Sequence, residues 1–152
     1  MSVVPVHSNR DLRRFIDLPY RLHARDPLWV PPLRRDVKLL LSRTKNPFFE
    51  HAEAEYFLAE RGGQAVGRIA AIANRLHNTT HADKVGFFGF FETVDDQAVA
   101  DALLTAAAAW LRPRGFDTLR HMMRVRSSGP MRIGTIGVSD GPVSNPMLRK
   151  PS

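Results

Sequence analysis

The chain has 152 residues, enough for one domain with a buried core, and its 43% hydrophobic and 24% charged residues are typical of a globular protein. It contains no cysteine, which excludes disulfides, thiolate metal sites and a cysteine nucleophile. No apolar run is long enough to span a bilayer, and the polar start MSVVPVHSNRDLRRF lacks the apolar core of a signal peptide. We therefore expect a cytoplasmic protein with no membrane partner.

The net charge of +7 is unevenly distributed along the chain. Residues 1–120 carry 17 Lys/Arg and 14 Asp/Glu, whereas residues 121–152 carry 5 Lys/Arg and a single Asp. In the longer part the two signs are interspersed, as on an ordinary soluble surface. A basic nucleic-acid accessory module is kept as an alternative supported by charge alone, and nucleic acid is not the partner that we expect.

The first third of the sequence predicts a strand followed by helices. Residues 3–7 alternate as a short strand, and Ser8 then begins a helix as its N-cap. Three prolines make residues 26–32, DPLWVPP, an extended segment, which we expect Trp29 to anchor in the core. Helical spacing of apolar residues resumes at 33–41.

The middle of the sequence predicts a hairpin and then a β-α-β unit. Residues 53–61 and 65–73 alternate on either side of a Gly-Gly pair that supplies the positive φ angles of a two-residue turn. Residues 85–91 form a strand so rich in Phe that both of its faces must be covered. An acidic turn, a long amphipathic helix at 97–112 and a strand from 116 come next, which predicts parallel pairing of the two strands.

With these elements in order, the sequence resembles the GNAT acyltransferase superfamily, and more closely a bacterial GNAT-like family of uncharacterised N-acetyltransferase-type proteins. The resemblance is carried by LPYRLHARDPLWVPPLRRDVKLLL (18–41), NPFFEHAEAEYFLAERGGQAVGRIAAIAN (46–74) and KVGFFGFFETVDDQAVADALL (84–104). It implies an α/β fold with a mixed, mostly antiparallel sheet flanked by helices and splayed between its fourth and fifth strands. It also implies acyl-CoA bound in the splay and acyl transfer to an amine.

The same resemblance implies where the donor would bind. In the superfamily the backbone N–H groups of the turn after the fourth strand bind the CoA pyrophosphate at a helix N-terminus. Transferred to this chain, the phosphate turn consists of Val94, Asp95, Asp96, Gln97, Ala98 and Ala100, and only Ala100 keeps the residue of the family pattern. Two carboxylates would face the pyrophosphate, so the turn is equally well explained as a capped helix start.

The end of the Phe-rich strand supplies the remaining candidate site residues. Phe90 and Phe91 would form the strand edge, and Glu92 is the candidate general base, because a carboxylate beside aromatic surface can have a raised pKa. The alternative is a solvated glutamate at a strand end. His77 and His81 have a spacing that chelates zinc on a helix, but they lie in a predicted loop without a third ligand, and we expect no metal site.

We divide the chain into a GNAT-like domain at 1–120 and a basic tail at 121–152. The tail contains four Pro, four Gly and five Ser and none of the 13 aromatic residues, so we expect it to be poorly ordered apart from a candidate strand at 131–138. It does not resemble the family's continuation, which leaves the predicted sheet incomplete at its C-terminus. We hypothesise a truncated or frameshifted chain, which translating the gene in its other two frames beyond codon 120 tests.

The function implied is that of an N-acetyltransferase using acetyl-CoA or another acyl-CoA, with an unidentified amine acceptor. An inactive chain is kept as an outcome, because the fifth strand and the residues after it depart from the family. The alternative favoured by the acidic turn is a non-catalytic GNAT-like binding domain that forms a homodimer through an exposed sheet edge or Phe-rich surface.

Overall fold

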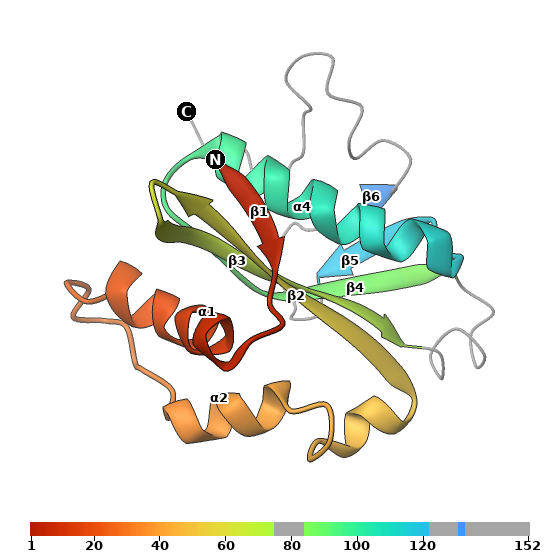
Figure 1. Cartoon of the computed structure of the whole chain (residues 1–152), viewed down its shortest axis with the longest axis horizontal. Helices are drawn as coiled ribbons and strands as arrows, with labels where there is room; N and C mark the ends of the chain where they lie inside the picture. The colour runs from red at the N-terminus through yellow and green to blue at the C-terminus, as the bar shows by residue number, and fades with distance from the viewer. Residues whose placement is uncertain (75–83, 122–130, 133–152) are drawn as a thin grey trace.

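The computed structural model describes residues 1–74, 84–121 and 131–132, which form one sheet covered by helices on both faces (Figure 1). The strands are β1 (Ser2–Pro5), β2 (Ala52–Arg61), β3 (Gln64–Asn74), β4 (Val85–Thr93), β5 (Thr118–His121) and β6 (Met131–Arg132). They lie in the order β1-β2-β3-β4-β5-β6. Of the predicted tail, only His121 at the end of β5 and the strand β6 lie within the described residues.

Every neighbouring pair of strands is antiparallel except β4 and β5, which are parallel. The connection between that pair is the helix α4 (Gln97–Leu111), followed by the short 3-10 helix η2 (Arg112–Arg114). A parallel pair needs such a crossover, because the chain must return to the same end of the sheet. The predicted β-α-β unit and the mixed, mostly antiparallel sheet are therefore confirmed.

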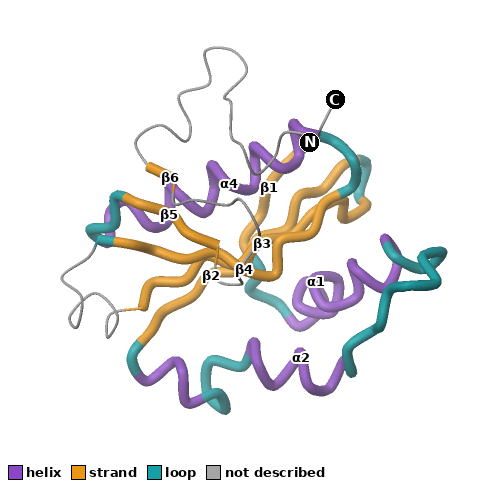
Figure 2. The backbone as a smooth tube through the Cα atoms, turned by 180° about the vertical axis from the view of Figure 1, so that it is seen from behind, coloured by secondary structure: helices purple, strands orange, loops and turns teal. Residues whose placement is uncertain are grey.

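The remaining helices cover the opposite face of the sheet from α4, as Figure 2 shows from behind. They are α1 (Asn9–Leu22), α2 (Arg34–Leu41) and the 3-10 helix η1 (Pro47–Glu50). Ser8 caps α1 as predicted, because its hydroxyl accepts the N–H of Asp11 at 3.1 Å. The helix continues through Pro19 to Leu22.

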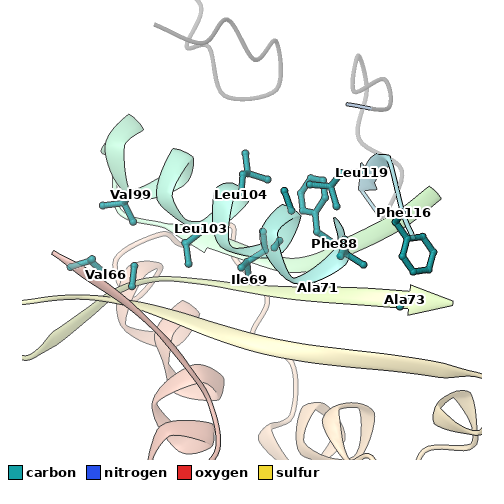
Figure 3. Close-up of a cluster of buried hydrophobic side chains, with 14 residues drawn as sticks. Val66, Ile69, Ala71, Ala73, Phe88, Val99, Leu103, Leu104, Phe116 and Leu119 are labelled. Carbon is teal, nitrogen blue, oxygen red and sulfur yellow. The ribbon is translucent and has the colours of Figure 1, made fainter. Parts of the chain in front are cut away.

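Alternate residues of the central strands supply two separate cores. On the α4 side, Val66, Ile69, Ala71 and Phe88 pack against Val99, Leu103 and Leu104 (Figure 3). On the other side, Tyr56, Leu58, Ala70 and Ile72 pack against Phe15 and Ile16 of α1 and Val37 and Leu41 of α2. Successive side chains of a strand point to opposite faces of the sheet. Each central strand therefore contributes some residues to one core and some to the other.

Trp29 does not anchor the 26–32 segment in either core, so that prediction is wrong. Its ring is half-buried and lies 5.2 Å from the ring of His23, nearly parallel to it, and edge-on to Tyr20 at 5.3 Å. The hydroxyl of Tyr20 donates to the carbonyl of Pro32. The predicted extended conformation is also wrong at the start of this segment, because residues 26–29 form a turn in which the carbonyl of Asp26 accepts the N–H of Trp29 at 3.3 Å.

We predict that Leu103→Ala lowers the free energy of unfolding by about 2–5 kcal/mol, because it deletes a fully buried side chain. A β-carbon added at Gly67 of β3 would lie 2.7 Å from Cδ1 of Leu103, which shows how closely α4 packs on the sheet there. Urea unfolding measures the change. Leu39→Ala on an exposed helix face is the matched control, and equal losses in both variants would contradict the assignment of Leu103 to the core.

Candidate active site

The candidate site is built around a β-bulge near the end of β4. Residues 85–88 pair with β5, and beyond Phe88 no residue of β4 pairs with the described part of β5. On its other edge β4 pairs Glu92 with Arg68 and Gly89 with Ala70, so Phe90 and Phe91 together lie opposite one residue of β3. Phe90 has a φ of 51°, a left-handed conformation that costs a non-glycine residue roughly 1–3 kcal/mol.

The guanidinium of Arg68 holds this bulge against α1. Its Nε donates to the carbonyl of Phe90 at 2.9 Å, and one terminal nitrogen donates to the carbonyl of Phe15 at 2.7 Å. The Phe15 carbonyl is the acceptor that an ordinary residue at position 19 would bond, but Pro19 has no N–H. Arg68 therefore satisfies a helix carbonyl that the proline leaves free.

Arg68 is only 6% exposed, so its charge is held inside the protein. Burial lowers the pKa of its guanidinium to about 10, and the nearby charge of Glu92 acts in the opposite direction. The group remains a cation at neutral pH, since its pKa is still well above 7. Its carbon lies 5.0 Å from the ring centre of Phe15 and 5.6 Å from that of Phe90, which adds cation–π attraction to the two hydrogen bonds.

Glu92 and His23 form the candidate acid–base pair. Nε2 of His23, the C-cap of α1, lies 3.0 Å from Oε2 of Glu92, and the two side chains are 32% and 29% exposed. Trp29 stacks on the imidazole and fixes its plane. A carboxylate bonded to an imidazole, both within reach of solvent, can take a proton from a bound group and pass it on.

An apolar pocket of about 90 Å³ lies beside the bulge, on the face covered by α2 and η1. Its lining includes Leu40, Phe48, Phe49, Tyr56, Ile72 and Phe90. The hydroxyl of Tyr56 donates to the carbonyl of Leu41 at 2.8 Å, and burial raises its pKa to about 12, so the phenol stays neutral. The pocket offers hydrocarbon and aromatic surface without a charged group, which suits an apolar ligand.

The predicted phosphate turn is occupied by the side chain of Asp96. Its Oδ1 accepts the N–H of Ala98 at 2.9 Å, and its Oδ2 lies 2.7 Å from a terminal nitrogen of Arg61. The backbone carbonyl of Asp96 takes the N–H groups of Val99 and Ala100. The N–H groups of Ala98, Val99 and Ala100 are therefore bonded within the chain, and with the carboxylate of Asp96 in place this turn does not fit a pyrophosphate as it stands.

The structure brings some of the predicted residues together and separates others. Phe90 packs in the core covered by α1 and α2, whereas Phe91 packs in the core covered by α4. Glu92 lies beside Phe90 on the α1 side, while the 94–100 turn lies beyond the end of the strand. The roles assigned to these residues stay predictions. His77 and His81 lie outside the described residues, in which no group of three potential metal ligands occurs.

Sequence reasoning missed His23 and Arg68. His23 is 69 positions from Glu92, and nothing in its local pattern indicates a partner. Pro19 within a helix does signal a free carbonyl four residues earlier, so a donor near Phe15 was predictable, but not that Arg68 would supply it.

Comparison with solved structures identifies the fold. The chain superimposes with a TM-score of 0.62 on a tandem GNAT protein from the clavulanic acid biosynthesis pathway, covering 86% of this chain and 39% of that one at 20% identity. A GNAT family acetyltransferase from Brucella melitensis in complex with acetyl-CoA matches with a TM-score of 0.55 at 13% identity, covering 83% and 77%. The class is therefore a GNAT-fold protein, as the sequence predicted.

Two curated proteins are similar in sequence. The chain is 47% identical over 134 residues to the bacterial ceramide synthase of Caulobacter vibrioides (strain NA1000 / CB15N), a match covering 88% of this chain and 33% of that protein. It is 39% identical over 108 residues to protein YghO of Escherichia coli (strain K12), covering 71% and 27%. The chain is thus a homologue of part of these proteins and spans about a third of their length or less. No family model matches.

We predict a pH-dependent effect of Asp96→Asn, which keeps an acceptor for the helix but removes the charge. The hydrogen bond from Arg61 and then that from the Ala98 N–H hold the pKa of Asp96 below its ordinary value. Its charge therefore stabilises the fold above the pKa of an unfolded aspartate, about 4, and this contribution is lost as the pH falls through the lowered folded value.

Thermal melts of wild type and Asp96→Asn from pH 7 to pH 3 measure this effect. The variant should melt at a lower temperature near pH 7, and the gap should close toward the acid end. Asp101→Asn, one turn further along α4, is the charge-matched control. If the difference in melting temperature between wild type and Asp96→Asn does not change with pH, the charge of Asp96 contributes nothing to the stability of the fold.

Proposed function

We propose that this chain is the catalytic GNAT-fold part of an N-acyltransferase that joins an acyl group from acyl-CoA to a lipid amine. The observation that carries the proposal is the Glu92–His23 pair beside the bulge of β4, 3.0 Å apart and partly open to solvent. The similarity to a protein named a bacterial ceramide synthase supports the same reaction class. A ceramide synthase makes an amide from an acyl donor and a long-chain amine.

The role of the pair is to prepare the amine. An amine is protonated at neutral pH, and it must lose that proton before its nitrogen can attack a carbonyl carbon. Glu92 accepts the proton, and His23, bonded to the same carboxylate, carries it toward solvent. Arg68 keeps the strand that carries Glu92 in place, because it fastens the Phe90 carbonyl to α1.

The donor would bind along the part of β4 that has no described partner strand. Backbone groups of an unpaired strand edge can bond a ligand as another strand would. When bound, acyl-CoA supplies an acyl group activated as a thioester, which ends on the amine nitrogen as an amide while CoA leaves as a thiol. The strand edge suits the acyl end of this donor, whereas the Asp96 turn does not suit its pyrophosphate.

The apolar pocket favours a lipid over a small polar acceptor. It lies on the α1–α2 side of the sheet, as does Glu92, and Phe90 belongs to its lining. Hydrocarbon placed against these side chains is removed from water, at roughly 25 cal/mol per Å² of apolar surface. A polar amine gains no such stabilisation there.

A non-catalytic GNAT-fold domain is the second candidate, and the Asp96 turn is the observation that favours it. A turn in which Asp96 already accepts the N–H groups of Ala98, Val99 and Ala100 needs no phosphate ligand for them. Such a domain would give no acyl transfer with any donor, and acyl-CoA would not raise its melting temperature, because selective binding to the folded state is what stabilises it.

We predict that Glu92→Gln lowers kcat for acyl transfer to a long-chain amine by about 10²–10⁴-fold, as expected for loss of a general base. The amide keeps the shape of the side chain but does not accept the proton. Release of the CoA thiol, followed with a disulfide dye, measures the rate without background, since the chain contains no cysteine. Acetyl-CoA and a long-chain acyl-CoA are compared as donors.

Glu53→Gln is the matched control, because Glu53 also lies on a strand but its carboxylate faces Arg114, at 3.3 Å. It should leave the rate within about twofold, as expected of a surface change. Equal activity of Glu92→Gln and wild type would refute the role of Glu92. A wild-type chain with no transfer and no thermal shift with either donor would favour the non-catalytic domain.

A further inference from the structure

The excess positive charge of the described residues is concentrated in one segment. Residues 9–41, which contain α1, α2 and their connection, carry eight Lys/Arg and four Asp. The other described residues carry nine Lys/Arg and nine Asp/Glu. The two helices lie side by side on one face of the sheet (Figure 1), so this excess belongs to one side of the molecule.

Several of these cations surround a cavity of about 300 Å³ between α1 and α2. Arg13, Arg34, Arg35 and Lys38 line it, and Asp17 is the only carboxylate among its lining residues. Asp17 is engaged by Arg34 at 2.9 Å. Arg35 and Lys38 are exposed and have no carboxylate partner among the described residues, so they are available to an anion.

The same segment carries the large apolar side chains that face solvent. Of the six large hydrophobic residues exposed in the described structure, five lie between positions 28 and 40: Leu28, Val30, Leu33, Leu39 and Leu40. Leu28 is 88% and Val30 83% exposed. We call this set, together with Arg13, Arg35 and Lys38, the α1–α2 face. Exposed apolar residues gathered among cations are typical of a surface that lies on a membrane.

The α1–α2 face is continuous with the apolar pocket beside Phe90. Leu40 is both exposed and part of the lining of that pocket. Hydrocarbon that enters at Leu40 therefore reaches the core side of the β4 bulge, next to the strand that carries Glu92. No charged residue lines that pocket.

We propose that the α1–α2 face docks on an anionic lipid bilayer, with its cations among the headgroups and Leu28, Val30 and Leu39 in the apolar layer beneath. A second copy of the chain does not fit as well, because a two-fold contact would set the same cations against themselves. Nucleic acid would use the cations but would leave the leucines in water. That docking also delivers a lipid acceptor rests on the proposed function, whereas the docking itself does not.

This proposal revises the expectation that a membrane is not a partner. That expectation came from the lack of a spanning segment. No helix in the described part of the chain is long and apolar enough to span a membrane. A surface that lies on a bilayer needs no such helix, because only one face of it enters the interface.

Vesicle sedimentation of the purified chain tests the proposal without any measurement of activity. Vesicles of phosphatidylcholine with phosphatidylglycerol are compared with phosphatidylcholine alone, each in about 0.1 M and 0.5 M salt, concentrations that differ in screening length. We expect binding to the anionic vesicles that weakens at the higher salt, and little binding to the neutral ones. Equal binding to both kinds of vesicle, or to neither, overturns the proposal.

Two double variants separate the contributions of charge and apolar surface. Arg35→Glu with Lys38→Glu should weaken binding by about thirtyfold or more, because each cation near an anionic surface contributes roughly a fivefold factor. Leu28→Ser with Val30→Ser should weaken it by at least roughly tenfold, through the loss of buried apolar area. Thermal melts confirm that each variant is folded.

Lys84→Glu with Arg120→Glu is the charge-matched control, since both residues are exposed and lie at the start of β4 and on β5, away from the α1–α2 face. It should bind anionic vesicles nearly as the wild type does. Equal weakening by this control would show a general charge effect and contradict a dedicated face. Light scattering measures whether the chain forms a dimer. If the wild type is a dimer, and Leu28→Ser with Val30→Ser makes it a monomer without changing vesicle binding, the α1–α2 face is a contact between two copies of the chain and the proposal is wrong.

Discussion

One buried cation connects the parts of this protein on which its candidate site depends. Arg68 donates to the carbonyl of Phe15 in α1 and to that of Phe90 at the bulge of β4. Pro19 has no N–H and leaves the carbonyl of Phe15 free, and the bulge of β4 presents the carbonyl of Phe90. The guanidinium of Arg68 therefore bonds one irregular point of a helix and one of a strand. A buried guanidinium without these carbonyls would be strongly destabilising. The position of Glu92, two residues after Phe90, depends on this arrangement.

The two faces of the sheet differ in how closely the helices pack on them. On one face α4 packs so closely that a β-carbon added at Gly67 would lie 2.7 Å from Cδ1 of Leu103, and an apolar cluster is buried between this helix and the sheet. The other face, which α1, α2 and η1 cover, contains several cavities, among them one that four cations line and one that is apolar. Looser packing at a face is what allows a ligand to enter, whereas a core packed at crystal density does not admit one.

Local patterns were enough to predict most of the architecture. The Gly62-Gly63 turn, the Ser8 cap and the Phe-rich strand each obey short-range rules, and the structure has all three. The predicted placement of Trp29 was wrong, because the chain turns at residues 26–29 and leaves the ring half-buried against His23. Asp96 was expected both at a phosphate turn and as a cap, and the structure shows it as a cap.

By itself the sequence determined the order of helices and strands and the β-α-β crossover, because these depend on periodicity, caps and turns within a few residues. The class of fold came from the resemblance of three segments to a known superfamily. The sequence also placed Phe90 and Glu92 at the end of one strand. Only the tertiary structure decided that His23 meets Glu92, that Arg68 joins α1 to β4, and that five large apolar residues between positions 28 and 40 are exposed. Such contacts join residues far apart in the chain, and they arise from how helices pack on the sheet, which no local pattern encodes.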